Sequence, residues 1–374
     1  MNAPEYEIEL RLNDVLIGDV RKLAQNLVWE RRRTINGVDS ISFTLNDTLF
    51  EKWCNDRNTT IKDLLKPLAL DCRVIRNGVA VCGGFLATMP AYTPNGTSAN
   101  LDLQFDGYLN LLAGVYIRPT ATTTMPMATM IEGWIYDADS RAEAAGKGFG
   151  FISGDLDNLA SVTQTFDGYK TVKEAITDRA DNITGAGIFD IYFHPDRTYD
   201  IKSDANFGLT RSYIINYPTM LNGISAVSIQ AQEVDGFASH VIAIGAGETS
   251  ADVGKNTAIV SESTNPEAVL EYGYYETLYQ DSSISRQTTL DGKAESQVAA
   301  LSNPLWQPEI TLTGRQIAPS PEGDDSIWIG DRITINNTED MTGQTNGLFR
   351  VQALSVRVTS SNAEDITPVL ERVA

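Results

Sequence analysis

The two histidines of the chain, His194 and His240, carry the side chains that could exchange a proton near neutral pH. His194 precedes a proline at a predicted hairpin tip, and His240 begins an apolar strand pattern. Neither is accompanied by a Gly-x-Ser-x-Gly elbow or by a Cys–His signature of nucleophilic catalysis. We interpret both as structural residues, and we expect no catalytic residue and no enzyme.

Two glycine-rich segments come close to nucleotide-binding motifs. The first, Gly245 to Ser250, follows a predicted strand but has serine in place of the third glycine of a dinucleotide loop. The second, Gly254-Lys255, lacks the earlier glycine of a phosphate loop and is followed by Asn256 instead of serine or threonine. Both are interpreted as turns, and we expect no bound cofactor.

The cysteines do not indicate a metal site either. Cys54, Cys72 and Cys82 are too few for a disulfide framework and lack Cys-x-x-Cys spacing. A two-residue turn at Asn77-Gly78 would pair Cys72 with Gly83 and place the sulfurs of Cys72 and Cys82 on opposite faces of a hairpin. We therefore expect free thiols, no metal, and folding in a reducing cytoplasm.

The charge balance opposes several classes of partner. Among 374 residues, 29 are Lys or Arg and 49 are Asp or Glu, which gives a formal net charge of −20. A surface of this sign repels the phosphates of nucleic acids and anionic membranes. No apolar run reaches the length of about 18 residues that a membrane-spanning helix needs, and the first residues do not resemble an export signal.

Alternating apolar and polar residues predict a mainly β protein with a small α+β insert. The insert begins at about residue 119, where a threonine-rich stretch is followed by helical spacing of apolar residues and by the capping box Thr171-Val172-Lys173-Glu174. A further helix is predicted from Leu290 to Leu301, after a Ser/Thr/Gly-rich loop from Ala246 to about Pro266. The principal predicted strands are 6–12, 26–32, 40–45, 72–86 as a hairpin, 100–105, 212–217, 224–232, 239–244, 309–312, 326–328, 331–335, 348–358 and 366–373.

Basic and turn residues on these strands are the candidates for contacts with a neighbouring chain. Arg31-Arg32-Arg33 is the strongest basic run, and it reads either as a charged exposed strand edge or as a salt-bridged contact to an acidic neighbour. The candidate interface residues are Arg31, Arg32, Arg33, Arg76, Asn77, Gly78 and Asp331.

The order of these pieces resembles the tail hub proteins, also called baseplate hub or Tal-type tail-tip proteins, of long-tailed bacteriophages. The resemblance covers nearly the whole chain, although each motif alone is weak. The matching segments are Trp29-Glu30-Arg31, Ser40-Ile41-Ser42-Phe43-Thr44-Leu45, the hairpin Val74 to Gly83, Phe105-Asp106-Gly107-Tyr108-Leu109-Asn110-Leu111-Leu112, Val241 to Gly247, Glu271-Tyr272-Gly273-Tyr274-Tyr275-Glu276, the helix Leu290 to Leu301 and Gly330-Asp331-Arg332-Ile333.

This resemblance implies two tube-type β-barrel domains plus inserted domains. The first barrel would comprise residues 1–118 and 206–235, the α+β insert residues 119–205, and the second barrel residues 236–374 with an accessory helical segment at about 255–305. It further implies a homotrimer that adapts a six-fold tail tube to a three-fold tip and guides or gates DNA ejection. Lumenal carboxylates would repel the passing DNA without binding it specifically.

The implied location is the tail tip of a virion, after synthesis in the host cytoplasm. The implied partners are the distal tail protein ring, the carboxyl end of the tape-measure protein and a tip fibre or spike protein. Because the chain stops after a final strand, we expect a hub without an appended enzyme or fibre.

Two alternatives remain open at this point. The chain could be the distal tail protein itself, a hexameric adaptor, although the barrel-like blocks at both chain ends argue against it. It could also be a cytosolic glycan-binding or glycan-active β protein that uses Trp134, Trp306 and Trp328 as sugar platforms, although packing in the core is the more common role of such residues.

Overall fold

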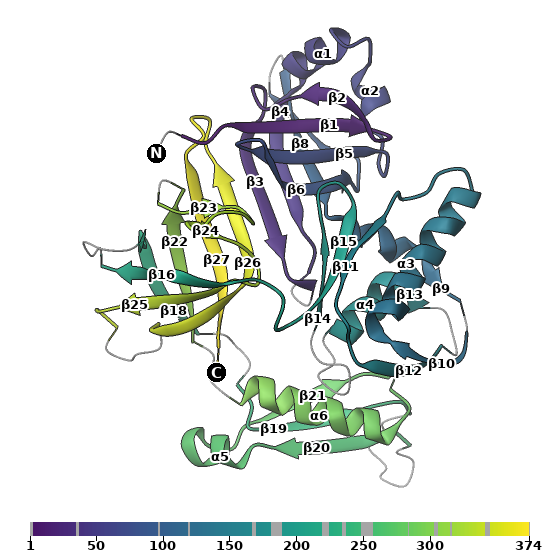
Figure 1. The fold of residues 1–374 in the computed structure, drawn as a ribbon, viewed down its shortest axis with the longest axis vertical. Helices are drawn as coiled ribbons and strands as arrows, with labels where there is room; N and C mark the ends of the chain where they lie inside the picture. Colours follow the sequence, from purple (N-terminus) through teal and green to yellow (C-terminus); the bar gives the residue numbers. More distant parts are fainter. Residues whose placement is uncertain are drawn as a thin grey trace. The chain divides into compact units, whose positions relative to one another are not determined.

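A computed structural model gives the architecture of the chain (Figure 1). It describes residues 3–34, 37–95, 98–118, 120–166, 170–180, 189–218, 224–233, 237–247, 257–282, 284–302, 306–314, 316–340 and 345–373. The chain forms two compact units. The larger comprises Met1–Asp181, Ala186–Gln230 and Pro308–Ala374, and the smaller comprises Asn182–Gly185 and Ala231–Gln307.

The amino-terminal block of the larger unit is antiparallel sheet. Its strands follow the order β3-β4-β8-β6-β5-β1-β2, and β7 pairs with β8. The alternation that predicted these strands places one side of each in the core. The elements are β1 (Tyr6–Leu12), β2 (Val15–Asp19), β3 (Gln25–Arg32), β4 (Ser40–Asn46), α1 (Asp47–Asn55), α2 (Ile61–Leu64), β5 (Leu70–Arg76), β6 (Val79–Leu86), β7 (Ala91–Asn95) and β8 (Ser98–Asp106).

The carboxyl-terminal block continues the same sheet through one long strand, β26 (Gly347–Val358). The first residues of β26 pair with β25, its later residues pair with β3, and β27 pairs along most of its length. We expected residues 206–235 to belong with the first barrel, but β16 pairs with β25 and β18 pairs with β22. These pairings join residues more than 70 positions apart, which no local pattern encodes. The other strands are β16 (Thr210–Tyr217), β17 (Ile224–Ser225), β18 (Ser228–Glu233), β22 (Trp306–Thr313), β23 (Ala318–Pro319), β24 (Ser326–Ile327), β25 (Arg332–Asn337) and β27 (Glu364–Arg372).

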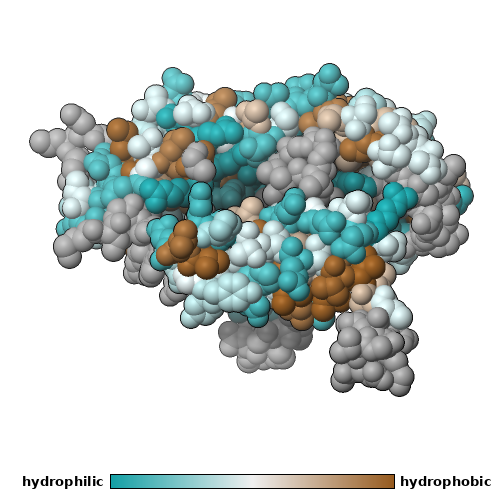
Figure 2. Space-filling model, turned by 90° about the horizontal axis from the view of Figure 1, so that it is seen from below, coloured by the Kyte–Doolittle hydropathy of each residue, from teal (hydrophilic) through white to brown (hydrophobic). Residues whose placement is uncertain are grey.

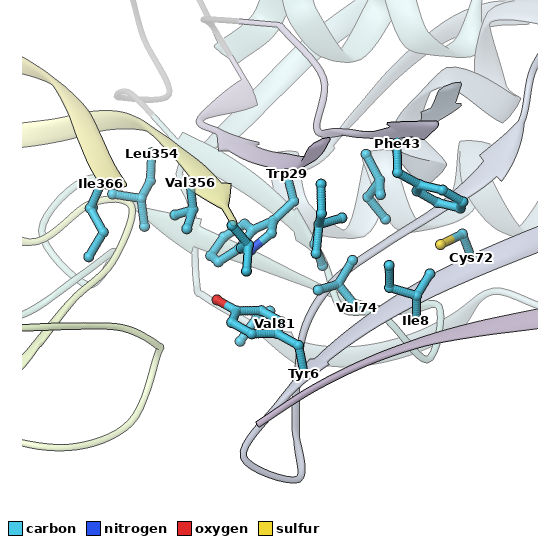
Figure 3. Packing of buried hydrophobic residues seen from close by; sticks show 14 of the residues in the cluster. Tyr6, Ile8, Trp29, Phe43, Cys72, Val74, Val81, Leu354, Val356 and Ile366 are labelled. Atoms are coloured by element: carbon cyan, nitrogen blue, oxygen red, sulfur yellow. The ribbon is translucent and has the colours of Figure 1, made fainter. Parts of the chain in front are cut away.

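A single hydrophobic cluster extends through both blocks. Trp29 on β3 is fully buried and lies between side chains of the two blocks, with Tyr6 and Val81 near its ring and Val356 on its other flank (Figure 3). The Trp29 and Trp328 ring centroids are 6.1 Å apart. Trp328 therefore belongs to the core and is not a surface platform.

The α+β insert has a second hydrophobic cluster of its own. Helices α3 and α4 lie against one face of the three-stranded sheet β11-β15-β14, in which β15 is the central strand. The mainly β fold class with a small α+β insert is thus confirmed. The elements are η2 (Tyr108–Gly114), β9 (Tyr116–Ile117), β10 (Thr120–Pro126), α3 (Met127–Ala144), β11 (Ile152–Leu156), β12 (Ser161–Phe166), β13 (Lys170–Thr171), α4 (Val172–Ala180), β14 (Phe189–Phe193) and β15 (Thr198–Ser203).

The smaller unit is a three-stranded sheet, β20-β19-β21, with helix α6 against one face. The loop predicted from Ala246 to Pro266 was wrong at its far end, because residues 260–264 form β20 and pair with β19. Helix α6 begins three residues earlier than predicted. The elements are β19 (His240–Ile244), β20 (Val260–Thr264), α5 (Pro266–Tyr272), β21 (Glu276–Gln280) and α6 (Gln287–Leu301).

The β5–β6 hairpin corrects the predicted cysteine geometry. Cys72 pairs with Gly84 and Val74 with Cys82, because a register shift between Val74 and Ile75 adds one residue to β6. The two cysteines consequently share one face, and both are buried free thiols. Burial raises the pKa of Cys82 to about 12.

Candidate functional site: buried arginines and an open sheet face

The arginine run begins at the end of β3, a strand that lies inside the sheet between β26 and β4 and not at an exposed edge. Arg31 continues the buried face of Leu27 and Trp29 and is itself fully buried. Its Nη1 donates to the Asp39 carboxylate at 2.7 Å, and its Nη2 donates to the Phe193 carbonyl at 2.9 Å. Burial opposes its charge, but Asp39, Tyr192 and Cys82 together outweigh this effect and raise the pKa of Arg31.

Aromatic rings complete the environment of Arg31. Its guanidinium carbon lies 4.3 Å from the centroid of the Tyr192 ring and 5.8 Å from that of Trp328. These distances are within the range of cation–π attraction. Since Tyr192 belongs to β14, this arginine fastens the insert to the large sheet.

Arg33 makes a second connection to β14. Its Nε donates to Oδ2 of Asp190 at 2.9 Å, and its Nη2 donates to Asp204 at 2.9 Å. Asp190 is fully buried, and Arg350 also donates to Asp204. The ion pair between Arg33 and Asp190 needs these hydrogen bonds, because a buried charge without a partner raises the free energy of the fold.

Arg76 and Asp331 are also buried and paired within the chain. Arg76 on β5 binds Glu364 on β27 through two bonds, with Nε–Oε1 at 2.6 Å and Nη2–Oε2 at 3.0 Å. The Asp331 carboxylate accepts from Nε of Arg211 at 2.7 Å. These bidentate and charge-assisted bonds connect distant parts of the same unit.

Of the seven predicted interface residues, the structure places four, Arg31, Arg33, Arg76 and Asp331, inside the chain. Their ion-pair partners lie within the chain, and the most exposed of the four, Arg76, is 8% exposed. Arg32 pairs with Glu30 at 2.8 Å on the surface, and Asn77-Gly78 forms the β5–β6 turn with both residues at positive φ. The interface role of these three residues stays a prediction.

Sequence reasoning missed a further ion pair. Arg197, at the β14–β15 turn, donates from Nη2 to the buried Asp71 of β5 at 2.5 Å. Its guanidinium also lies 5.3 Å from the ring centroid of Tyr108. Because 126 positions separate the two partners, no local signal could have identified them.

The histidines take structural positions. His194 Nε2 lies 2.9 Å from Oδ2 of Asp200, and His240 Nδ1 lies 2.7 Å from Oγ1 of Thr264. Within the described ranges, no group of three His, Cys, Asp or Glu side chains is arranged to hold a metal ion. Likewise, none of the helices described is both long and apolar enough to cross a membrane. The glycine-rich residues 248–256 lie outside the described part of the chain.

The sheet of the smaller unit has one face that no described element of that unit covers. Ile242 lies opposite Glu262 and Leu278 in the register, and Ile244 lies opposite Val260 and Gln280. Leu278 is 55% exposed and Val260 39%. Figure 2 shows hydrophobic residues gathered in patches among hydrophilic ones on the side that it views. We name this set of Ile242, Ile244, Val260 and Leu278 the open face.

No family model matches the sequence, and no curated protein matches it either. Solved structures do. A tail protein from Neisseria meningitidis aligns with a TM-score of 0.62 at 13% identity, covering 98% of this chain and 96% of that chain. The 43 kDa tail protein of prophage MuSo2 from Shewanella oneidensis gives 0.57 at 10% identity, covering 98% of each chain.

A prophage tail protein from Listeria monocytogenes gives a TM-score of 0.51 at 13% identity, covering 97% of this chain and 94% of that chain. All three alignments span both blocks, the insert and the smaller unit, since nearly every residue of this chain is included. The chain therefore has the fold of phage tail proteins, as its motif order predicted.

Proposed function

We propose that this chain is a structural protein of a phage-type tail and that three copies form a hub ring at the tail tip. The observation that carries the proposal is the likeness of the fold to three phage tail proteins over nearly their full lengths. In this role the chain adapts a six-fold tube to a three-fold tip, and it performs no catalytic step.

The construction of the larger unit supports a ring. Two strand blocks are present per chain, so three chains supply six blocks around one axis. The shared strand β26 holds the two blocks in one sheet. This continuity suits a ring that must keep its bore while DNA passes through it.

The charge supports a conduit for DNA. A net charge of −20 per chain, repeated three times, repels phosphate wherever carboxylates line the bore. The DNA then slides without specific contacts. In the tail, the partners would be the distal tail protein ring, the carboxyl end of the tape-measure protein and a tip fibre or spike protein.

The open face supports assembly. Exposed apolar groups that lie together on one face commonly mark a protein interface. In the proposed trimer, a neighbouring copy covers this face. Replacing Leu278 with glutamate would then place a charge in the interface.

The test is the mass of the purified chain by analytical ultracentrifugation. Three copies of the 40.9 kDa chain give about 123 kDa. The Leu278→Glu variant should sediment as a monomer, whereas Leu49→Glu, a matched change at an exposed leucine of α1, should remain trimeric. A hexamer would instead indicate a distal tail protein, and a monomer at all concentrations would contradict the hub.

A further inference from the structure

A cavity of about 350 Å³ lies between helix α3 and the β11–β15 strands of the insert. Thr129, Glu132, Gly133 and Tyr136 line its helix side. Their spacing of three and four residues places them on one face of α3. Phe151, Ser153 and Tyr199 line the strand side. The volume accommodates one large side chain or a small ligand.

The walls of this cavity combine aromatic rings with carboxylates. Tyr136 is 73% exposed at the mouth, while Tyr199 is buried at the base. Asp139 is held in place because its carboxylate accepts backbone N–H bonds from Phe149, Gly150 and Phe151, the last two at 3.1 and 3.3 Å. Burial raises the pKa of Tyr199, and the carboxylates of Glu132 and Asp139 add to this rise, while the hydroxyl of Ser153 opposes it.

The Glu132 carboxylate is half-buried, and none of the described residues gives it a hydrogen bond or an ion pair. No Lys, Arg or His is among the described residues that line the cavity. The basic side chains of α3, of β15 and of the turn before β15 are paired with other carboxylates: Arg141 with Asp137, Lys202 with Asp155 and Arg197 with Asp71. An anionic ligand would therefore be repelled, and a cation would be attracted.

We propose that this cavity binds the guanidinium of an arginine that a partner protein presents. The guanidinium would form an ion pair with Glu132 and lie against the ring of Tyr136, as its planar shape allows. An ammonium group can make the ion pair but stacks less well.

An exposed aromatic side chain at the mouth favours a protein partner over a free cation. Tyr136, which is 73% exposed, would contact the residues that flank the arginine. An arginine inserted into a pocket with an apolar surround is a common hot spot of protein interfaces. This site does not depend on the proposed trimer.

Gly133 offers a direct way to block the cavity. A Cβ at this position would meet no atom within 4 Å, so a longer side chain would extend into open space. Glycine inside a helix is unfavourable relative to residues such as methionine. Gly133→Met should therefore fill the cavity while keeping or raising the melting temperature.

The experiment measures binding of N-acetyl-arginine-N-methylamide to the full chain by NMR titration, with the neutral citrulline analogue as the matched probe. We expect a dissociation constant on the order of 1 mM for the arginine probe and binding at least about tenfold weaker for citrulline. Glu132→Gln should weaken binding of the arginine probe about tenfold, and Gly133→Met should abolish its binding. Glu143→Gln, at an exposed carboxylate on the same helix, should change nothing.

Equal affinity for the two probes, or unchanged binding to Glu132→Gln, would overturn the cation site. So would methyl glucoside binding that Glu132→Gln leaves intact, because this result indicates a neutral sugar site. A leucine–arginine–leucine peptide should bind more tightly than the single residue. A peptide that binds no more tightly would rule out the protein partner.

Discussion

The insert and the smaller unit each contain a three-stranded sheet built in the same way. In β11-β15-β14 and in β20-β19-β21, the central strand has one parallel and one antiparallel neighbour. Helices pack on one face of each sheet. The second faces differ: β14 presents Asp190 and Tyr192 to the arginines of β3, whereas the smaller unit presents the open face, whose apolar side chains lie beside Glu262 and Gln280.

The two faces therefore have different roles: one contributes to the stability of the single chain, and the other is available for assembly. A polar face can be buried within one chain when every charge on it has a partner. An apolar face that stays exposed lowers its free energy only when another surface covers it. The insert is therefore completed by its own chain, and in our proposal the smaller unit is completed by a neighbour.

Breaking the arginine contact should have the largest effect. Arg33→Met leaves the fully buried Asp190 without its cation, which should lower the free energy of unfolding by about 3–5 kcal/mol. Urea denaturation followed by tryptophan fluorescence measures this loss. Arg32→Met is the control, since its exposed pair with Glu30 should contribute at most about 1 kcal/mol.

If the two variants lose the same stability, the contact between β3 and β14 does not hold the insert in place. A double variant tests whether the loss of stability comes from the unpaired charge of Asp190. Adding Asp190→Leu to Arg33→Met removes the unpaired charge and should restore part of the lost free energy.

Truncating one apolar residue in each sheet gives the next largest contrast. Ile201 on β15 is fully buried, and Ile201→Ala should cost about 2–5 kcal/mol. Leu278→Ala on β21 should change the unassembled chain by no more than about 0.5 kcal/mol, because that side chain is already exposed. Amide hydrogen exchange at low protein concentration measures the loss of protection in each sheet separately, and so distinguishes the effect of Ile201→Ala from that of Leu278→Ala. Equal loss of protection would mean that the smaller unit covers Leu278 itself.

The pH dependence should provide the smallest effect. Burial opposes ionisation of Asp204, but Arg350 and Arg33 outweigh it and hold the pKa of Asp204 below its usual range. Its contribution to stability is therefore complete above the unfolded pKa of about 3.9 and is lost as the pH falls through the folded value. Wild type should exceed Asp204→Asn by about 1 kcal/mol at pH 7, and by less at pH 3.

Urea melts of both proteins at pH 7, 5 and 3 test this expectation. Asp324→Asn is the matched control, because that residue is exposed. A gap between wild type and Asp204→Asn that stays constant with pH would show that the charge of Asp204 is not what stabilises the fold.

Local patterns were sufficient for much of the fold. The strand alternation around Leu101 and Leu103 and the capping box at Thr171 are recovered, with Thr171 Oγ1 accepting from Glu174 N at 3.1 Å. These signals work because a strand face and a helix start depend on neighbouring residues. The β20 strand was missed because its serine and threonine side chains resemble a loop and its partner strand stabilises it.

The site was less accessible to sequence reasoning than the fold. The basic run at Arg31 was identified, but its burial depends on Asp39 and on Tyr192, which lies far along the chain. The cavity beside α3 was not identified, since helix and strands meet there only in three dimensions. The burial of Arg31 and the cavity beside α3 both depend on contacts between residues far apart in the chain. The local patterns of a single sequence do not predict such contacts.

The strand β26 makes the two blocks of the larger unit mechanically continuous. The first residues of β26 pair with β25 and its later residues pair with β3, so one stretch of backbone crosses the boundary between the blocks. The boundary falls near Val351, where the register of β26 against β27 shifts. A force on one block is therefore transmitted to the other along the backbone of β26.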